Sequence, residues 1–112
     1  MRILFKLATR SRRLKATSSI RNIIENCASN NFIILVSCDY DDVEMNDFTY
    51  DHPNVLVVYG NSKNKIDAIN RDMCLVPLWD ILINTSDDMV FGVKGFDDII
   101  RQVFGNDMDL FI

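Results

Sequence analysis

Apolar and polar positions follow two different spacings along the chain. Nearly continuous apolar runs predict four strands, at 2–8, 32–38, 54–60 and 79–84, with a further strand beginning at Leu110. Apolar residues three or four positions apart predict three helices, at 16–28, 62–73 and 95–104. Strands that alternate with helices connect by right-handed crossovers. The pattern therefore predicts an α/β fold, with a mainly parallel sheet and helices on both of its faces.

Polar residues indicate where these elements begin and end. Thr17 and Ser18 are available to cap the first helix, and Ser62 is available to cap the second. The last residues, "DMDLFI", start a new strand just as the chain stops. Because a domain rarely ends inside a strand, we expect residues 1–112 to be the first, truncated half of a larger domain.

Composition narrows the class of protein. The 112 residues are 48% apolar, which is enough for one folded core, and the net charge of −4 argues against a nucleic-acid-binding protein. Three cysteines without a C-x-x-C pair favour reduced thiols in a cytoplasmic protein and give no zinc motif. No apolar run approaches ~18 residues, so no transmembrane segment is predicted, and peripheral association with the inner membrane face stays open.

Charged residues are concentrated in loops that follow strands. The first fifteen residues hold six basic residues and no acid, whereas six acids lie within 39–51. A local basic cluster in an acidic domain fits a small anionic ligand better than a charged polymer. The polar loops 9–13, 39–42 and 86–89 each follow a predicted strand. Ligands bind beyond the carboxyl ends of parallel strands, so we expect these three loops to form a binding site.

Two adjacent acids, Asp87 and Asp88, close the fourth predicted strand. Neighbouring residues of an extended chain point to opposite sides, so the two carboxylates are expected to have different roles. One would contact a sugar hydroxyl, and the other would bind Mg²⁺ or Mn²⁺, which prefer oxygen ligands. The alternative is a capped turn, with Ser86 and the two acids starting the next element.

Other polar residues at this edge allow two interpretations each. Asp39 and Asp41 follow a buried strand, either as part of a solvated acidic loop or with Asp39 accepting from a donor such as a base N–H. Lys63 and Lys65 lie near the start of helix 62–73, where the helix dipole favours an anion, yet lysines there are also commonly solvated. Neither common glycine-rich nucleotide-binding motif is present.

In chain order, the motifs are "SCDYDD", "VVYGNSKNKIDAINRDM" and "WDILINTSDDM". They resemble the amino-terminal, nucleotide-binding half of a GT-A glycosyltransferase, closest to the family 2-like enzymes. In that family a G-N…A-x-N helix precedes a strand that ends in a D-x-D element. The resemblance covers essentially the whole chain and implies a Rossmann-like half-domain. Thr85 stands where the family usually has the first acid of that element.

The resemblance implies a role for each site residue. The implied nucleotide-binding residues are Thr9, Arg10, Arg12, Asp39, Asp41, Lys65 and Asp87, and the implied metal ligands are Asp88 and Asp87. Asp39 would accept a hydrogen bond from uracil or another pyrimidine, and Lys65 would lie near the diphosphate. Asp87 would contact the ribose or donor sugar, while Asp88 would bind the metal.

The implied reaction moves a sugar from a nucleotide-diphosphate donor, a UDP-sugar, to a hydroxyl group of a glycan, lipid or other acceptor. Mn²⁺ or Mg²⁺ would act as a Lewis acid on the departing diphosphate. The catalytic base is unknown, because the family has it in the part of the domain that would follow Ile112. We therefore expect this chain alone to bind nucleotide without turnover.

Two other functions fit parts of the sequence. The run "ILVSCDYDDV" also fits a haloacid-dehalogenase-type, Mg²⁺-dependent phosphatase, with Asp39 as nucleophile and Asp41 as acid and base. Thr85 or Ser86 would then bind phosphate. The second alternative is a non-catalytic, doubly wound binding module of the receiver type, whose acids gather around Mg²⁺.

Overall fold

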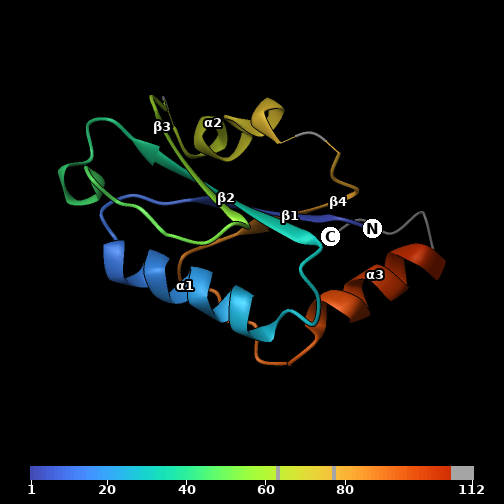
Figure 1. Cartoon of the computed structure of the whole chain (residues 1–112). Helices are drawn as coiled ribbons and strands as arrows, with labels where there is room; N and C mark the ends of the chain where they lie inside the picture. Colours follow the sequence, from blue (N-terminus) through green and yellow to red (C-terminus); the bar gives the residue numbers. More distant parts are fainter. Residues whose placement is uncertain (63, 77, 107–112) are drawn as a thin grey trace.

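A single parallel sheet forms the centre of the protein. The computed structural model describes residues 1–62, 64–76 and 78–106. Its strands are β1 (Ile3–Ala8), β2 (Phe32–Asp39), β3 (Val55–Gly60) and β4 (Ile81–Thr85), and its helices are α1 (Arg13–Asn26), α2 (Lys65–Asn70) and α3 (Phe96–Asn106). The strand order is β3-β2-β1-β4, and every pair is parallel (Figure 1). The predicted α/β fold with a parallel sheet is confirmed.

Both faces of the sheet are covered, because side chains alternate between the faces of a strand. On one face, Phe5 and Ile34 pack with Ile20 of α1 and Phe96 of α3. On the other face, Leu4 and Leu35 pack with Val76, which follows the short 3-10 turn Met73–Leu75. Figure 1 shows α1 and α3 below the sheet and α2 above it. Among the described residues, no helix is long and apolar enough to cross a membrane.

The predicted start of the first helix was wrong. Helix α1 begins at Arg13, three residues before the predicted position, and Thr17 lies inside it. The Thr17 hydroxyl donates to the Arg13 carbonyl oxygen at 2.9 Å, so it continues the helix instead of capping it. Ser18 lies in the same turn. Polar side chains therefore misled the prediction because they also bond to the carbonyl four residues earlier.

The second predicted helix was too long at both ends. Asn64 caps α2, its side-chain oxygen accepting from the Asp67 backbone N–H at 2.9 Å, where Ser62 was predicted to cap. The helix ends at Asn70, because Asp72 has a φ of 67°, which a right-handed helix cannot include. The strand predicted to begin at Leu110 lies outside the described residues.

Asp97 fixes α3 to the loop between α1 and β2. Its buried carboxylate accepts from the backbone N–H groups of Ala28 (2.7 Å) and Ser29 (3.4 Å) and from the Arg101 guanidinium (2.6 Å). Burial acts to raise the pKa of Asp97, but these hydrogen bonds outweigh it and hold the pKa below its usual value. The ionised form of Asp97 therefore stabilises the folded state.

We expect Asp97→Asn to lower the free energy of unfolding by about 3 kcal/mol, because it breaks a buried, hydrogen-bonded ion pair. A carboxyl with a lowered pKa contributes stability above its unfolded pKa, so this contribution is lost as the pH falls below about 4. Urea denaturation between pH 3 and 7 measures both effects. Asp98→Asn is the matched control, since Asp98 also contacts Arg101 but is exposed. Equal losses in the two variants would contradict the assignment.

Candidate functional site

The carboxyl edge of the sheet holds a cavity of about 670 Å³. It is lined by the ends of β1, β2 and β4, the loops that follow them, and residues of α2. Six of the predicted site residues line this one cavity: Thr9, Arg10, Arg12, Asp39, Asp41 and Asp87. The three loops predicted to meet at this edge of the sheet therefore do so.

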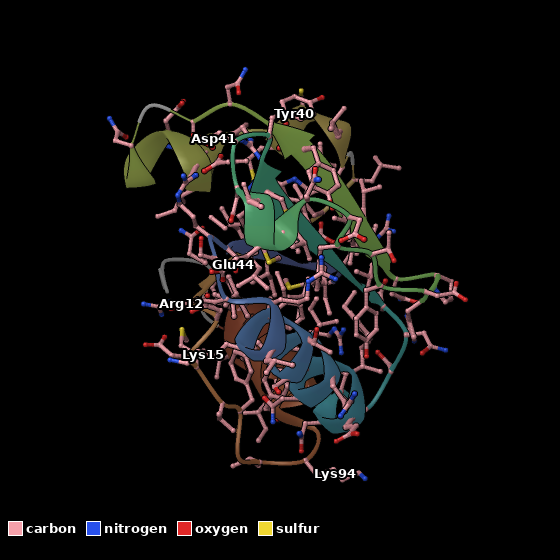
Figure 2. All side chains as sticks on the ribbon, turned by 90° about the vertical axis from the view of Figure 1, so that its left-hand side faces the viewer. Arg12, Lys15, Tyr40, Asp41, Glu44 and Lys94 are labelled. Carbon is pink, nitrogen blue, oxygen red and sulfur yellow. The ribbon has the colours of Figure 1, made fainter. Side chains whose placement is uncertain are left out.

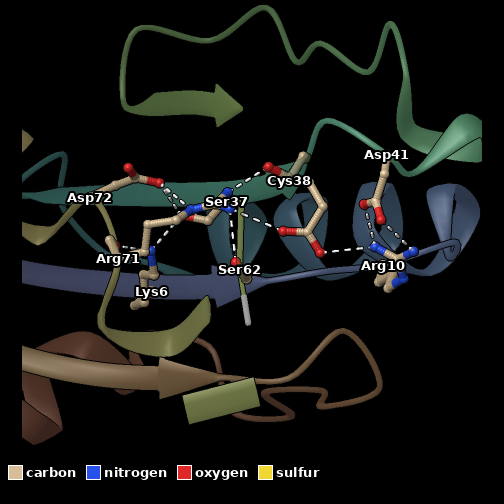
Figure 3. A network of polar contacts seen from close by, with 9 residues as sticks. Lys6, Arg10, Ser37, Cys38, Asp41, Ser62, Arg71 and Asp72 are labelled. Carbon is tan, nitrogen blue, oxygen red and sulfur yellow. Dashed lines mark hydrogen bonds and ion pairs between the residues drawn. The ribbon is translucent and has the colours of Figure 1, made fainter. Parts of the chain in front are cut away.

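Asp39 lies between two arginines, Arg10 and Arg71, which are both labelled in Figure 3. Its Oδ1 accepts from Arg71 Nη1 at 3.0 Å, and its Oδ2 accepts from Arg10 Nη1 at 3.0 Å. Arg10 also donates to Asp41 Oδ1 at 2.9 Å. That hydrogen bond holds the pKa of Asp41 below its usual value. Asp39 is thus the inner, half-buried acid, and Asp41 is the outer, solvent-exposed one.

Arg71 is the centre of this polar network. Its guanidinium donates to Asp72 Oδ2 (2.9 Å), Ser62 Oγ (2.8 Å) and the Cys38 carbonyl oxygen (2.5 Å), in addition to Asp39. Gly60 leaves room for it, since a Cβ there would come within 3.2 Å of the guanidinium carbon. Sequence analysis missed Arg71, because the predicted helix 62–73 gave no reason to turn this side chain toward the strand ends.

Lys6 is a second site residue that sequence analysis missed. It lines the cavity from β1 and is only 1% exposed. Its ammonium donates to Ser37 Oγ and to the Arg71 carbonyl oxygen (2.5 Å), and Ser37 in turn donates to Asp72 Oδ2 at 2.9 Å. Burial lowers the pKa of Lys6 to about 8, although Asp72 acts in the opposite direction. Because helices were predicted on both faces of the sheet, β1 was expected to have no solvated side. This was the sequence signal that Lys6 would be buried.

Asp87 and Asp88 have different surroundings, but they lie in a turn after β4, where the Met89 N–H donates to the Ser86 carbonyl oxygen at 3.1 Å, and not on the extended chain from which the difference was predicted. Asp87 is buried and accepts from Thr9 Oγ1 (3.2 Å) and Arg12 Nη1 (3.1 Å). Asp88 is exposed, and its Oδ1 accepts from Ser86 Oγ at 2.5 Å, which lowers its pKa. Asp88 lies outside the main cavity, in a neighbouring groove of about 410 Å³ between α1 and the loop after β4.

Lys65, predicted near the diphosphate, and its neighbour Lys63 are only partly described. Lys65 is the first residue of α2, but its side chain lies outside the described part of the chain, as does all of Lys63. Within the described residues, no group of three or more His, Cys, Asp or Glu side chains is arranged to hold a metal ion.

Arg12 is the most accessible cation beside Asp87. About half of its side chain is exposed, whereas Asp87 is almost fully covered. Figure 2 shows Arg12 at the start of α1, with Lys15 further along the same helix. Lys15 lines the neighbouring groove but not the main cavity. The cavity is therefore lined by a buried cation, Lys6, and by two exposed cations, Arg10 and Arg12.

Comparisons of the chain with protein-family models, with curated proteins and with solved structures found no match. The function of this cavity must therefore be argued from its own geometry. The cavity lies at the carboxyl edge of a parallel sheet, where such folds bind ligands, and two exposed arginines, Arg10 and Arg12, line it.

Proposed function

We propose that this chain binds the nucleotide of a nucleotide-diphosphate sugar, most simply UDP, as the Rossmann-like donor half of a GT-A-type glycosyltransferase. The observation that carries the proposal is that Asp39 lines the cavity together with Arg10 and is held from behind by Arg71, which does not line it. Asp39 therefore presents an acceptor to the cavity beside the donors of Arg10.

This arrangement complements the imide edge of uracil, in which an N–H lies between two carbonyl oxygens. Asp39 would accept from that N–H, since each of its carboxylate oxygens has a lone pair beyond the one used by an arginine. The guanidinium group of Arg10, which lines the cavity, would face one of the two carbonyl oxygens. Cytosine has no ring N–H at the central position, so it would leave Asp39 facing another acceptor.

The phosphates would lie toward Arg12 and the loop after β4. Arg12 is the exposed cation at that end, and Thr9 and Asp87 offer a hydroxyl and a carboxylate to ribose or the donor sugar. Asp88 Oδ2 has the chemistry of a Mg²⁺ or Mn²⁺ ligand, and the carboxylate is exposed beside the cavity. When bound, the cation would supply Lewis-acid stabilisation of the leaving diphosphate.

Isothermal titration with UDP and CDP, each with Mn²⁺, tests this function. We expect UDP to bind at least ~10-fold more tightly than CDP, because an unpaired buried acceptor costs about 1–3 kcal/mol. Absence of UDP binding, or equal affinity for UDP and CDP, would contradict the proposal. Hydrolysis of p-nitrophenyl phosphate that is lost in Asp39→Asn would favour the phosphatase instead.

A further inference from the structure

The Lys6 ammonium is a buried cation without a direct ion-pair partner. Among the described residues it forms no ion pair, although every arginine of the surrounding network contacts a carboxylate. Its hydrogen-bond acceptors are a hydroxyl, Ser37 Oγ, and a carbonyl, Arg71 O. An ammonium group has three N–H donors, so these two acceptors leave one donor for another partner.

Keeping a charge at this position opposes folding. Buried charges are normally paired, and the lowered pKa of Lys6 shows that burial disfavours its charged form. Leu4, which shares the face of β1 that carries Lys6, is a fully buried apolar residue. An unbranched apolar side chain such as methionine would fill the same space without this cost. The lysine therefore needs an explanation other than core packing.

The surroundings of Lys6 indicate what the remaining donor would meet. The cavity that Lys6 lines also includes Ser37, which accepts from Lys6, and Asn84, which is paired with it in β4. Ala68 and Ile69 of α2 line the same cavity, whereas the charged neighbours of Lys6, Asp72 and Arg71, do not. A flat ring held between α2 and the strand ends would have its polar edge toward Lys6 and Asp39, which both line the cavity.

We propose that Lys6 is a base-recognition residue, whose ammonium donates a hydrogen bond to a carbonyl oxygen of the bound pyrimidine. This inference rests on the proposed nucleotide-binding function and assigns that function a further specificity-determining group. A base that directs a carbonyl oxygen to Lys6 satisfies the remaining donor. A base that directs an amino group there places a donor against a buried cation, which is unfavourable.

The test compares Lys6→Met with the native chain, using UDP and inorganic diphosphate as probes, each with Mn²⁺. Inorganic diphosphate lacks the base, so its affinity reports the phosphate end of the cavity alone. We expect Lys6→Met to weaken UDP binding about 10- to 100-fold, the usual value of a hydrogen bond to a charged group, without changing diphosphate binding. Lys94→Met, at an exposed lysine that lines neither the cavity nor the neighbouring groove, should bind both probes normally.

A second measurement separates direct contact from support of Arg71. The native chain should bind either 2-thio-UDP or 4-thio-UDP more weakly than UDP, because sulfur is the poorer acceptor, and Lys6→Met should remove that difference. Lys6→Gln, which retains a donor for the Arg71 carbonyl, should behave as Lys6→Met does and serves if the methionine variant does not fold.

Each result assigns Lys6 differently. Unchanged UDP affinity in Lys6→Met would overturn the inference, because Lys6 would then be only structural. Equal losses for UDP and diphosphate would also overturn it and would assign Lys6 to phosphate binding or to the fold. A native chain that binds diphosphate but not UDP would instead overturn the proposed function itself. Loss confined to UDP, together with loss of thio discrimination, supports the inference.

Discussion

Replacing Arg71 with leucine is expected to abolish measurable UDP binding and to lower the free energy of unfolding by about 3–5 kcal/mol. The guanidinium joins Asp39 and Asp72, two carboxylates that are each only 15% exposed. Removing it leaves both without their shared cation in a poorly solvated place, which is the costly way to break a buried pair. The same change removes the group that holds Asp39 Oδ1 in the proposed base site.

Two substitutions serve as controls for Arg71→Leu. Arg21→Leu removes an exposed arginine of α1 and should change neither urea denaturation nor UDP titration. Arg71→Lys keeps the charge but not the planar fork that reaches Asp39, Asp72 and Ser62 together, so it should lose most of the UDP affinity. UDP binding that survives Arg71→Leu would contradict the role of the Arg10–Asp39–Arg71 arrangement.

The position of the cavity follows from the sequence through topology. Alternating strands and helices predict a parallel sheet, and a parallel sheet places all strand ends at one edge. Thr9, Asp39 and Asp87 each lie at or just after the end of a strand, so their meeting needs no knowledge of side-chain direction. What the pattern does not specify is the order of the strands, which brings β4 beside β1 and thus Asp87 beside Thr9.

The roles of Arg71 and Lys6 in the site could not be predicted, because the directions and burial of their side chains depend on details that hydrophobic spacing does not encode. The direction of Arg71 depends on the end of α2, on the left-handed Asp72 and on the space above Gly60. These are features of backbone geometry, and only Gly60 is visible as a signal in the sequence. Lys6 was visible as a charge within "ILFKLA", but a single lysine in a strand ordinarily marks a solvated side. Because helices cover both faces of the sheet, β1 has no solvated side, and Lys6 cannot be explained in that way.

The basic loop after β1 was expected to attract a small anionic ligand, but in the structure its arginines already contact acids. Three of its arginines each contact an acid: Arg10 contacts Asp39 and Asp41, Arg12 contacts Asp87, and Arg13 contacts Asp47. The basic and acidic clusters of the sequence therefore largely neutralise each other. An anionic ligand would have to exchange partners, most readily at the exposed guanidinium of Arg12.

The roles of the adjacent acids, Asp87 and Asp88, can be distinguished by substituting each of them in turn. Asp88→Asn is expected to remove the Mn²⁺-dependent part of UDP binding, so that UDP binds the variant equally with and without Mn²⁺. The fold should be unaffected, because Asp88 is exposed and its one side-chain contact within the described chain is Ser86. Asp87→Asn should weaken UDP binding about 10-fold with or without Mn²⁺, because an amide accepts more weakly than a carboxylate.

Each of the two variants serves as the control for the other, because both replace a carboxylate by an amide, at neighbouring positions. Titration of UDP with Mn²⁺ and with excess chelator gives four affinities, and the ratio within each variant isolates the contribution of the metal. If Asp88→Asn keeps the native ratio while Asp87→Asn loses it, the metal belongs to the buried acid and Arg12 must leave Asp87 when the cation binds. If neither ratio changes, the two acids form a capped turn, as their spacing alone also allows.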